Sequence, residues 1–325
     1  MKAHWQSSLL AGLLLVATTP AHAQNAPYPT KPVQILADSA AGATPDVALR
    51  FVTERLGQLW GQQVLVVNRP GAGGSVAARA AADAPPDGYT LYQPVLSTFV
   101  SLKPPAPNVP IHVPKDFLPM GFVAENPMFI AVSPSLGVNN LAELIALAKK
   151  KPGEISYATT GIGRLTHLAG ELLQHEAGIK LLLVPYTGGP SHAVSDVATG
   201  RVNMIIEGYS GIAGAARAGA IKLIATASAK RLAEFPDVPT VAETIPGFQA
   251  TGWAILVAPL GTPDAIIRKV SDDLHKVTSE PALQQKLATL GSYTSPMTAA
   301  EAGAFAQKQQ SMWQPVLNDI AKNQK

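Results

Sequence analysis

Residues 32–67 read PVQILADSAAGATPDVALRFVTERLGQLWGQQVLVV, and this stretch decides the fold. A short apolar run over 33–37 predicts a buried strand, and apolar positions within 46–60 recur at helical spacing. A second run rich in β-branched residues, over 63–67, predicts the next strand. A strand, a helix and another strand in this order form a parallel β-α-β unit, in which helices cover both faces of the sheet.

The same alternation continues along the chain in two blocks, separated by a Pro-rich segment over 103–114. Further strands are expected over 90–95, 120–132, 155–158, 181–184, 203–207, 221–225 and 252–258, and further helices over 75–82, 140–149, 166–177, 191–199, 263–278, 281–290 and 299–320. We therefore expect a discontinuous α/β domain of residues 24–126 and 252–325, and a second α/β domain of residues 127–251. Two crossings between them create a cleft that a hinge can close on a ligand.

The N-terminus predicts export. Lys2 and His4 precede an apolar run over 9–17, and Ala21-His22-Ala23 then supplies the small-x-small pattern that signal peptidase recognises. The run is shorter than the roughly 20 residues that a transmembrane anchor needs. We expect residues 1–23 to be a signal peptide, cleaved near Ala23, and the mature protein to be periplasmic.

Composition excludes several classes of function. The chain has no cysteine, so it contains neither disulfides nor a thiolate nucleophile nor a Cys-based metal site. Its formal net charge is +3, and its basic residues are scattered except for the run Lys149-Lys150-Lys151. That run falls at the end of a predicted helix, where positive charge complements the helix dipole. A solvated structural role is favoured there over nucleic-acid binding.

Three loops of small residues follow predicted strands and precede predicted helices, over 39–46, 69–75 and 159–166. In open α/β sheets, ligands bind outside the carboxyl ends of the strands. Small residues let a ligand approach backbone N–H groups, and a helix N-terminus favours an anion. The first and third loops lie in different predicted domains and are expected to hold a ligand from two sides. The glycines of the middle loop are more simply explained by a tight turn.

Several side chains near these loops could carry chemistry. Arg164 could bind a carboxylate bidentately or face solvent, and His167 could cap the backbone or contact the ligand. Asp46 is most simply an N-cap that orders the first loop. Asp38 and Glu207 follow strands; if they face the cleft, they favour a ligand that carries a cation as well as a carboxylate. Tyr186 could contact ligand or pack on its neighbours.

The sequence lacks the common motifs of nucleotide-binding proteins, hydrolases and metal sites. Neither Gly71-Ala72-Gly73 nor Gly161-Ile162-Gly163 completes G-x-G-x-x-G, and no G-K-[ST] occurs. Ser210 lacks the G-x-S-x-G spacing of a nucleophile elbow. The histidines show no metal-binding spacing. No catalytic residue, metal or cofactor is therefore expected.

Several segments together resemble the Bug family, the extracytoplasmic receptors of tripartite tricarboxylate transporters, over nearly all of the mature chain. These segments are 28–33 (YPTKPV), 68–74 (NRPGAGG), 86–91 (PDGYTL), 160–163 (TGIG) with His167-Leu168, 184–188 (VPYTG), and 236–240 (PDVPT) with Glu243. The resemblance implies a type II-like Venus flytrap of two α/β domains, in which backbone amides and bridging waters hold a carboxylate. It also implies a small and a large membrane permease subunit as partners.

The candidate ligand-binding residues combine the loop positions with those that the resemblance implies. They are Ser39, Ala41, Gly42, Ala43, Asp46, Thr160, Gly161, Gly163, Arg164, Thr166, His167, Tyr186, Thr187, Gly188 and Glu207. The first loop departs from the family pattern, because Asp38-Ser39 replaces Pro-Phe and Pro45 removes an N–H donor. Arg164 stands where the family more often has a small polar residue. These departures predict an unusual ligand or ligand position.

The leading prediction is a monomeric periplasmic receptor that captures a small organic carboxylate for uptake and does not bind nucleic acid. A periplasmic sensor for a membrane receptor kinase would use the same closure and is the first alternative. A secreted hydrolase or lyase is the second. It would require His167 to meet Glu207 or Asp46 within hydrogen-bond reach.

Overall fold

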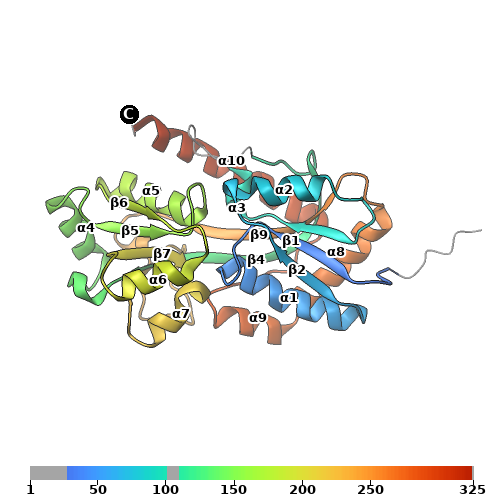
Figure 1. Cartoon of the computed structure of the whole chain (residues 1–325), viewed down its shortest axis with the longest axis horizontal. Coiled ribbons are helices and arrows are strands. Elements are labelled where there is room, and N and C mark those ends of the chain that lie inside the picture. Colours follow the sequence, from blue (N-terminus) through green and yellow to red (C-terminus); the bar gives the residue numbers. More distant parts are fainter. Residues whose placement is uncertain (1–27, 101–109, 324–325) are drawn as a thin grey trace, which may run out of the picture.

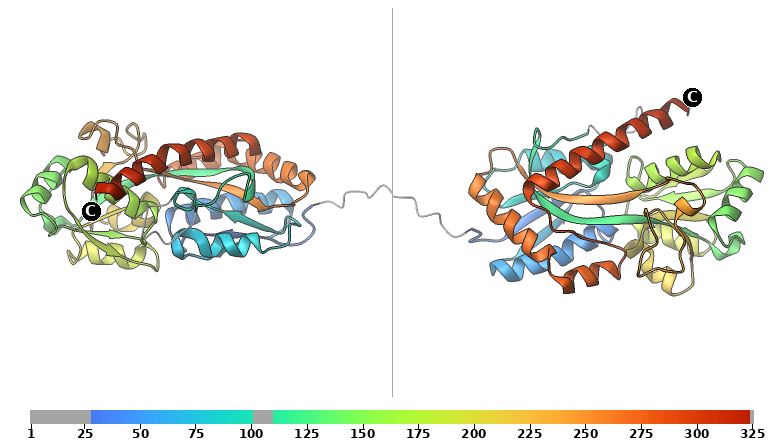
Figure 2. Two further views of the ribbon diagram at one scale, coloured as in Figure 1. Left: turned by 90° about the horizontal axis from the view of Figure 1, so that it is seen from above. Right: turned by 180° about the vertical axis from the view of Figure 1, so that it is seen from behind.

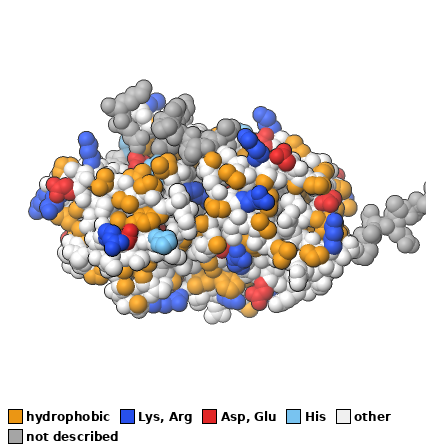
Figure 3. Space-filling model, in the orientation of Figure 1, with side chains coloured by type: hydrophobic (Ala, Val, Ile, Leu, Met, Phe, Trp, Pro, Cys, Tyr) orange, Lys and Arg blue, Asp and Glu red, His pale blue; other side chains and the backbone are white. Residues whose placement is uncertain are grey.

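The computed structural model describes residues 28–100 and 110–323 (Figure 1). The expected signal peptide, residues 1–23, and most of the Pro-rich segment lie outside these ranges. Within them, no helix has the length and apolar character that a membrane crossing requires. On the face shown in Figure 3, Lys and Arg side chains are scattered among other residues.

Three parallel strands form the N-terminal part of the sheet. This part comprises β1 (Val33–Ala37), β2 (Val64–Asn68) and β3 (Thr90–Gln93), with α1 (Thr44–Trp60), α2 (Ser75–Ala82), α3 (Leu96–Phe99) and the 3₁₀ turn η1 (Ala72–Gly74). β1 pairs with β2 on one side and β3 on the other. Because strand side chains alternate, Ile35 packs with α1 and Leu36 with α2 on the opposite face. This is the β-α-β unit that the opening stretch predicts.

Two long antiparallel strands run through the middle of the molecule (Figures 1 and 2). They are β4 (Phe117–Val132) and β9 (Thr251–Pro259). The part of β4 up to Pro127 pairs with β9, whereas its last residues, from Met128, pair with β7 and β8. The strand order is β2-β1-β3-β9-β4-β7-β5-β6, with β8 also on β4. One strand therefore belongs to both halves of the sheet.

The second half repeats the parallel pattern. It comprises β5 (Ser156–Thr159), β6 (Leu182–Pro185), β7 (Met204–Gly208) and β8 (Lys222–Thr226), with α4 (Leu141–Lys150), α5 (Leu165–Ala177), α6 (Pro190–Ala198), α7 (Tyr209–Arg217) and the 3₁₀ turns η2 (Pro134–Leu136) and η3 (Val241–Glu243). β5 lies between β6 and β7 and is parallel to both. Asn140 caps α4 by accepting the N–H of Glu143.

Three helices end the chain: α8 (Asp264–Thr278), α9 (Pro281–Ala288) and α10 (Ala299–Asn323). α8 buries Val270 and Leu274 against the first half. α10 goes further than expected, because its C-terminal part reaches α5 in the second half (Figure 2). There His175 Nε2 lies 3.5 Å from Asp319 Oδ2.

Candidate functional site

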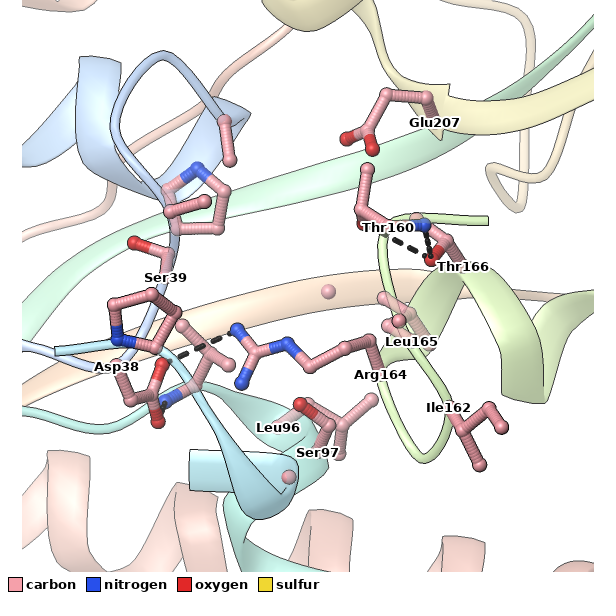
Figure 4. A pocket seen from close by; sticks show the side chains of 18 of the residues that line it. Asp38, Ser39, Leu96, Ser97, Thr160, Ile162, Arg164, Leu165, Thr166 and Glu207 are labelled. Carbon is pink, nitrogen blue, oxygen red and sulfur yellow. Dashed lines mark hydrogen bonds and ion pairs between the residues drawn. The ribbon is translucent and has the colours of Figure 1, made fainter. Parts of the chain in front are cut away.

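A cavity of about 310 Å³ lies between the two halves of the sheet (Figure 4). Its walls are formed by the segments that follow β1, β2, β3, β5 and β6, together with residues of β4, β7 and β9. Each of those segments leaves the carboxyl end of its strand, which is where open α/β sheets bind ligands. The topology therefore places one cavity where the sequence predicts the cleft.

The first loop is ordered by Asp46, but not in the expected way. Ala43 is the N-cap of α1, and Asp46 lies in the first turn, so the prediction that Asp46 is an N-cap is wrong. Its Oδ2 accepts the N–H of Gly42 at 2.9 Å, and its Oδ1 accepts from Asn68 Nδ2 at 2.8 Å. Arg50 pairs with the same carboxylate at 3.0 Å. Asp46 is buried by these contacts and does not line the cavity.

Asp38 directly follows β1 and lines the cavity with a fully buried side chain. Its Oδ2 accepts the N–H of Val95 at 3.3 Å and the hydroxyl of Thr98. Gly74 must be glycine here, because a Cβ would lie 2.5 Å from Thr98 Oγ1 and 2.9 Å from Asp38 Oδ2. The middle loop therefore packs against the Asp38 cluster, and its residues 70–73 also line the cavity.

Arg164 is the N-cap residue of α5, and its side chain extends across the cavity toward Asp38 (Figure 4). Its Nη2 lies 3.3 Å from Asp38 Oδ1, and the side chain is only 16% exposed. Its Nη1 is buried and has no hydrogen-bond partner. Of the two roles left open by the sequence, the solvent-facing one does not fit this position.

The third loop satisfies much of its own backbone. The N–H of Thr160 donates to Thr166 Oγ1 at 3.0 Å, and that of Gly163 donates to His167 Nδ1 at 3.2 Å. His167 Nε2 lies 3.5 Å from Glu171 Oε1. Burial lowers the pKa of His167, and the Glu171 carboxylate opposes this shift. His167 thus acts as a backbone acceptor and does not line the cavity.

Glu207 is the penultimate residue of β7 and is 3% exposed. Its Oε1 accepts the N–H of Gly208 at 2.9 Å, whereas its Oε2 is buried without a partner. Burial raises the pKa of Glu207 to about 7, although the Gly208 N–H, the Thr160 hydroxyl and the charge of Arg164 each lower it. The side chain faces the cavity on a different side from the Asp38–Arg164 pair (Figure 4).

Tyr186 makes a structural contact. Its hydroxyl donates to Asp196 Oδ2 at 2.6 Å, and Asp196 in turn pairs with Arg201. Tyr186 does not line the cavity, although Pro185 and Thr187 on either side of it do. The polar tip of the tyrosine is therefore turned toward α6.

The structure brings part of the predicted set together. The candidate residues that line the cavity are Ser39, Ala43, Thr160, Gly161, Arg164, Thr166, Thr187 and Glu207. Those that do not line it are Ala41, Gly42, Asp46, Gly163, His167, Tyr186 and Gly188. The sequence interpretation missed the middle loop as a lining segment and missed Asn126 and Trp253 on the long strands. The position of the middle loop after a strand was a usable signal. Contact of any of these residues with a ligand stays a prediction.

The groups of the hydrolase alternative do not meet. His167 contacts Gly163 and Glu171, and no hydrogen bond or ion pair among the described residues joins it to Asp46 or Glu207. Among the residues that the structure describes, no cluster of three or more His, Asp or Glu side chains could hold a metal ion.

Residues 48–322 match the family described as the tripartite tricarboxylate transporter family receptor. The chain belongs to this family. This receptor is 35% identical to an UPF0065 protein of Bordetella bronchiseptica, over 93% of this chain and 89% of that protein. It is also similar to the periplasmic binding protein BugD, with 29% identity and a TM-score of 0.81 over 90% of this chain and 98% of BugD.

A second similar structure is an R. palustris protein determined with adipate. It shares 27% identity with this receptor, at a TM-score of 0.84 over 91% of this chain and 98% of that one. These findings confirm the resemblance to the Bug receptors. They also confirm the fold class, which is the two-domain α/β architecture of periplasmic binding proteins.

Proposed function

We propose that this receptor captures a small organic carboxylate in the periplasm and delivers it to a membrane permease without changing it chemically. The observation that carries the proposal is the buried, unpaired Nη1 of Arg164 inside the cavity. A buried donor without a partner is costly, and a carboxylate is the acceptor that matches a guanidinium best. A ligand carboxylate would complete the hydrogen bonding of Arg164 while its Nη2 stays on Asp38.

Hydrogen bonding within the loops strengthens the role of Arg164. The amides of Thr160, Gly161 and Gly163 donate to Thr166, Thr159 and His167, and the amide of Gly42 donates to Asp46. These N–H groups are therefore engaged within the protein, although the resemblance implies that backbone amides hold the carboxylate. Charge-assisted hydrogen bonds are also about twice as strong as neutral ones. The guanidinium is thus the strongest donor that the third loop offers.

Closing and opening of two domains would capture and release the ligand. We assign residues 24–126 with 252–325 to one domain and residues 127–251 to the other. Three contacts between these parts surround the cavity and support closure. Arg164 pairs with Asp38, Ser210 Oγ donates to Thr44 Oγ1 at 3.0 Å, and Gly189 lies so near Ala41 that an added Cβ would be 3.3 Å from the Ala41 carbonyl oxygen. Ligand bound between the domains favours the closed state, because it gains contacts from both only there.

The transport partners follow from the family. The chain would act as a monomer that docks on a small and a large permease subunit, with no cofactor and no nucleic acid. The adipate in the R. palustris structure supports a carboxylate ligand, because that protein shares the fold over nearly the whole chain. Export of the mature protein from about residue 24 is part of the same proposal.

A ligand screen tests this function. Thermal melts of the mature protein are recorded with mono-, di- and tricarboxylates, aromatic acids and amino acids, and each ligand is recovered and analysed after incubation. Binding to the native state raises Tm in a saturable way. We expect such a shift with one class of carboxylate, and a ligand that is recovered intact. No shift with any carboxylate, or conversion of the ligand, would contradict the proposal.

A further inference from the structure

We propose that the ligand carries a positively charged nitrogen as well as a carboxylate, and that Glu207 is the residue that pairs with this nitrogen. The inference rests on the proposed function, because it assigns the second end of the ligand in the same cavity. It narrows the ligand class from carboxylates in general to zwitterionic amino carboxylates.

The balance of charge in the cavity is the first argument. Its charged lining residues, among those the structure describes, are Asp38, Arg164 and Glu207. Asp38 and Arg164 neutralise each other at 3.3 Å. Glu207 has no cation at ion-pair distance among the described residues, so its ionised form leaves one uncompensated negative charge. A ligand that brought only carboxylates would add to that excess, whereas a cationic nitrogen would cancel it.

The geometry of Glu207 is the second argument. One carboxyl oxygen is occupied by the N–H of Gly208, and the other is buried, unpartnered and within the cavity. Glu207 and the Asp38–Arg164 pair lie on different sides of this space (Figure 4). A ligand whose carboxylate meets Arg164 therefore extends its other end toward Glu207. The free Oε2 accepts a hydrogen bond from that end, and an ammonium donates the strongest one.

Desolvation is the third argument. Binding replaces the water in the cavity with ligand, which raises the cost of an ionised and unpaired carboxylate. Glu207 already shows this cost, because burial raises its pKa to about 7. A cationic nitrogen removes the cost by direct pairing. The competing solution is a dicarboxylate that shares a proton with Glu207, and the experiment separates the two.

The experiment compares ligands of equal length by isothermal titration calorimetry of the full mature chain at neutral pH. For chains of four to six carbons, the probes are the plain monocarboxylate, the 2-amino and ω-amino carboxylates, and the dicarboxylate. We expect an amino carboxylate to bind at least tenfold more tightly than the monocarboxylate and dicarboxylate of the same length. This wild-type ranking is independent of any variant. A dicarboxylate at the top of the ranking would overturn the inference and leave the proposed function intact.

The variant Glu207→Gln tests the assigned residue. It keeps the size of the side chain and removes the charge, so we expect a loss of at least tenfold in affinity for the amino carboxylate and no loss for the monocarboxylate. Glu54→Gln is the matched control, because Glu54 is exposed on α1 and lies 4.0 Å from Lys286. Equal affinity of E207Q and the wild type for the amino carboxylate would overturn the assignment. Failure of every carboxylate to bind the wild type would instead remove the proposed function, and the inference with it.

Discussion

Arg164 Nη2 lies 3.3 Å from Asp38 Oδ1, although the two residues are 126 positions apart in the sequence. Asp38 is fixed at the end of β1 by Val95 and Thr98, and Arg164 comes from the loop before α5 in the other half of the sheet. The pair therefore spans the cavity between the halves. It engages Nη2 of the guanidinium and leaves Nη1 buried without a hydrogen-bond partner in a residue that lines the cavity.

Replacing Arg164 with Gln should weaken carboxylate binding. Hydrogen bonds to charged groups contribute about 1.5–3 kcal/mol, which corresponds to a loss of roughly 10- to 100-fold in affinity. Asp38 would keep its donors from Val95 and Thr98, so the fold should persist. Calorimetric titration with the tightest carboxylate measures the effect. Arg268→Gln is the control, because Arg268 is exposed on α8. An affinity of R164Q equal to that of R268Q would refute the role of Arg164.

Gly208→Ala should keep the two domains from closing. A Cβ at this position would lie 2.3 Å from Thr44 Oγ1 and 2.6 Å from Thr44 Cβ, where the end of β7 meets the start of α1. Gly208 has φ −66° and ψ 148°, which any residue adopts, so the penalty is steric crowding between two parts of the same chain and not backbone strain. We expect at least tenfold weaker binding, and a radius of gyration in solution scattering that does not fall on addition of ligand.

Thr44→Gly in the same chain provides the control for this prediction. It removes the side chain that the new Cβ would meet, and Thr44 does not line the cavity. The double variant G208A/T44G should recover most of the lost affinity. If G208A alone bound and compacted like the wild type, the two domains would not need this contact to close.

The fold was largely predictable because apolar periodicity is a local property. The strand over 33–37 was predicted with its observed bounds, and the first helix began only two residues earlier than expected, since Ala43 took the N-cap position. α7 was missed, because Gly211 and Gly214 weaken its helical pattern. It forms nevertheless, since Ile212 and Ala213 are buried on the second half of the sheet.

The site was less predictable, because contacts between residues far apart in the sequence decide which side chains line the cavity. Asp46, His167 and Tyr186 have the chemistry of ligand-binding residues, but each is hydrogen-bonded to another residue of the folded chain. Asn126 reaches the cavity because the antiparallel register of β4 and β9 sets it opposite Gly252, beside Trp253. No pattern within a short window of sequence encodes that register.

Two glycine substitutions should have opposite effects on stability. In Gly170→Ala, the new Cβ would lie 2.3 Å from Tyr157 Cε2, and the ring of Tyr157 is fully buried. Such overpacking costs about 1–3 kcal/mol and outweighs the gain in helix propensity. In Gly214→Ala, nothing lies within 4 Å of the new Cβ, so stability should rise by up to about 1 kcal/mol. Urea unfolding measures both, and equal shifts in the same direction would contradict the packing of α5 on Tyr157.

Glu207 should make stability depend on pH. Burial raises its pKa from 4.5 to about 7, so the folded protein holds this proton to a higher pH than the unfolded chain does. The stability present below pH 4.5 is then lost as pH rises through 7, by on the order of 3 kcal/mol at pH 8. Glu207→Gln cannot ionise, so without ligand its Tm should exceed that of the wild type by roughly 5 °C at pH 8 and match it at pH 4.5. The exposed control Glu54→Gln should show no such difference between the two pH values. A Tm difference between E207Q and the wild type that is the same at both pH values would mean that folding does not raise the pKa of Glu207.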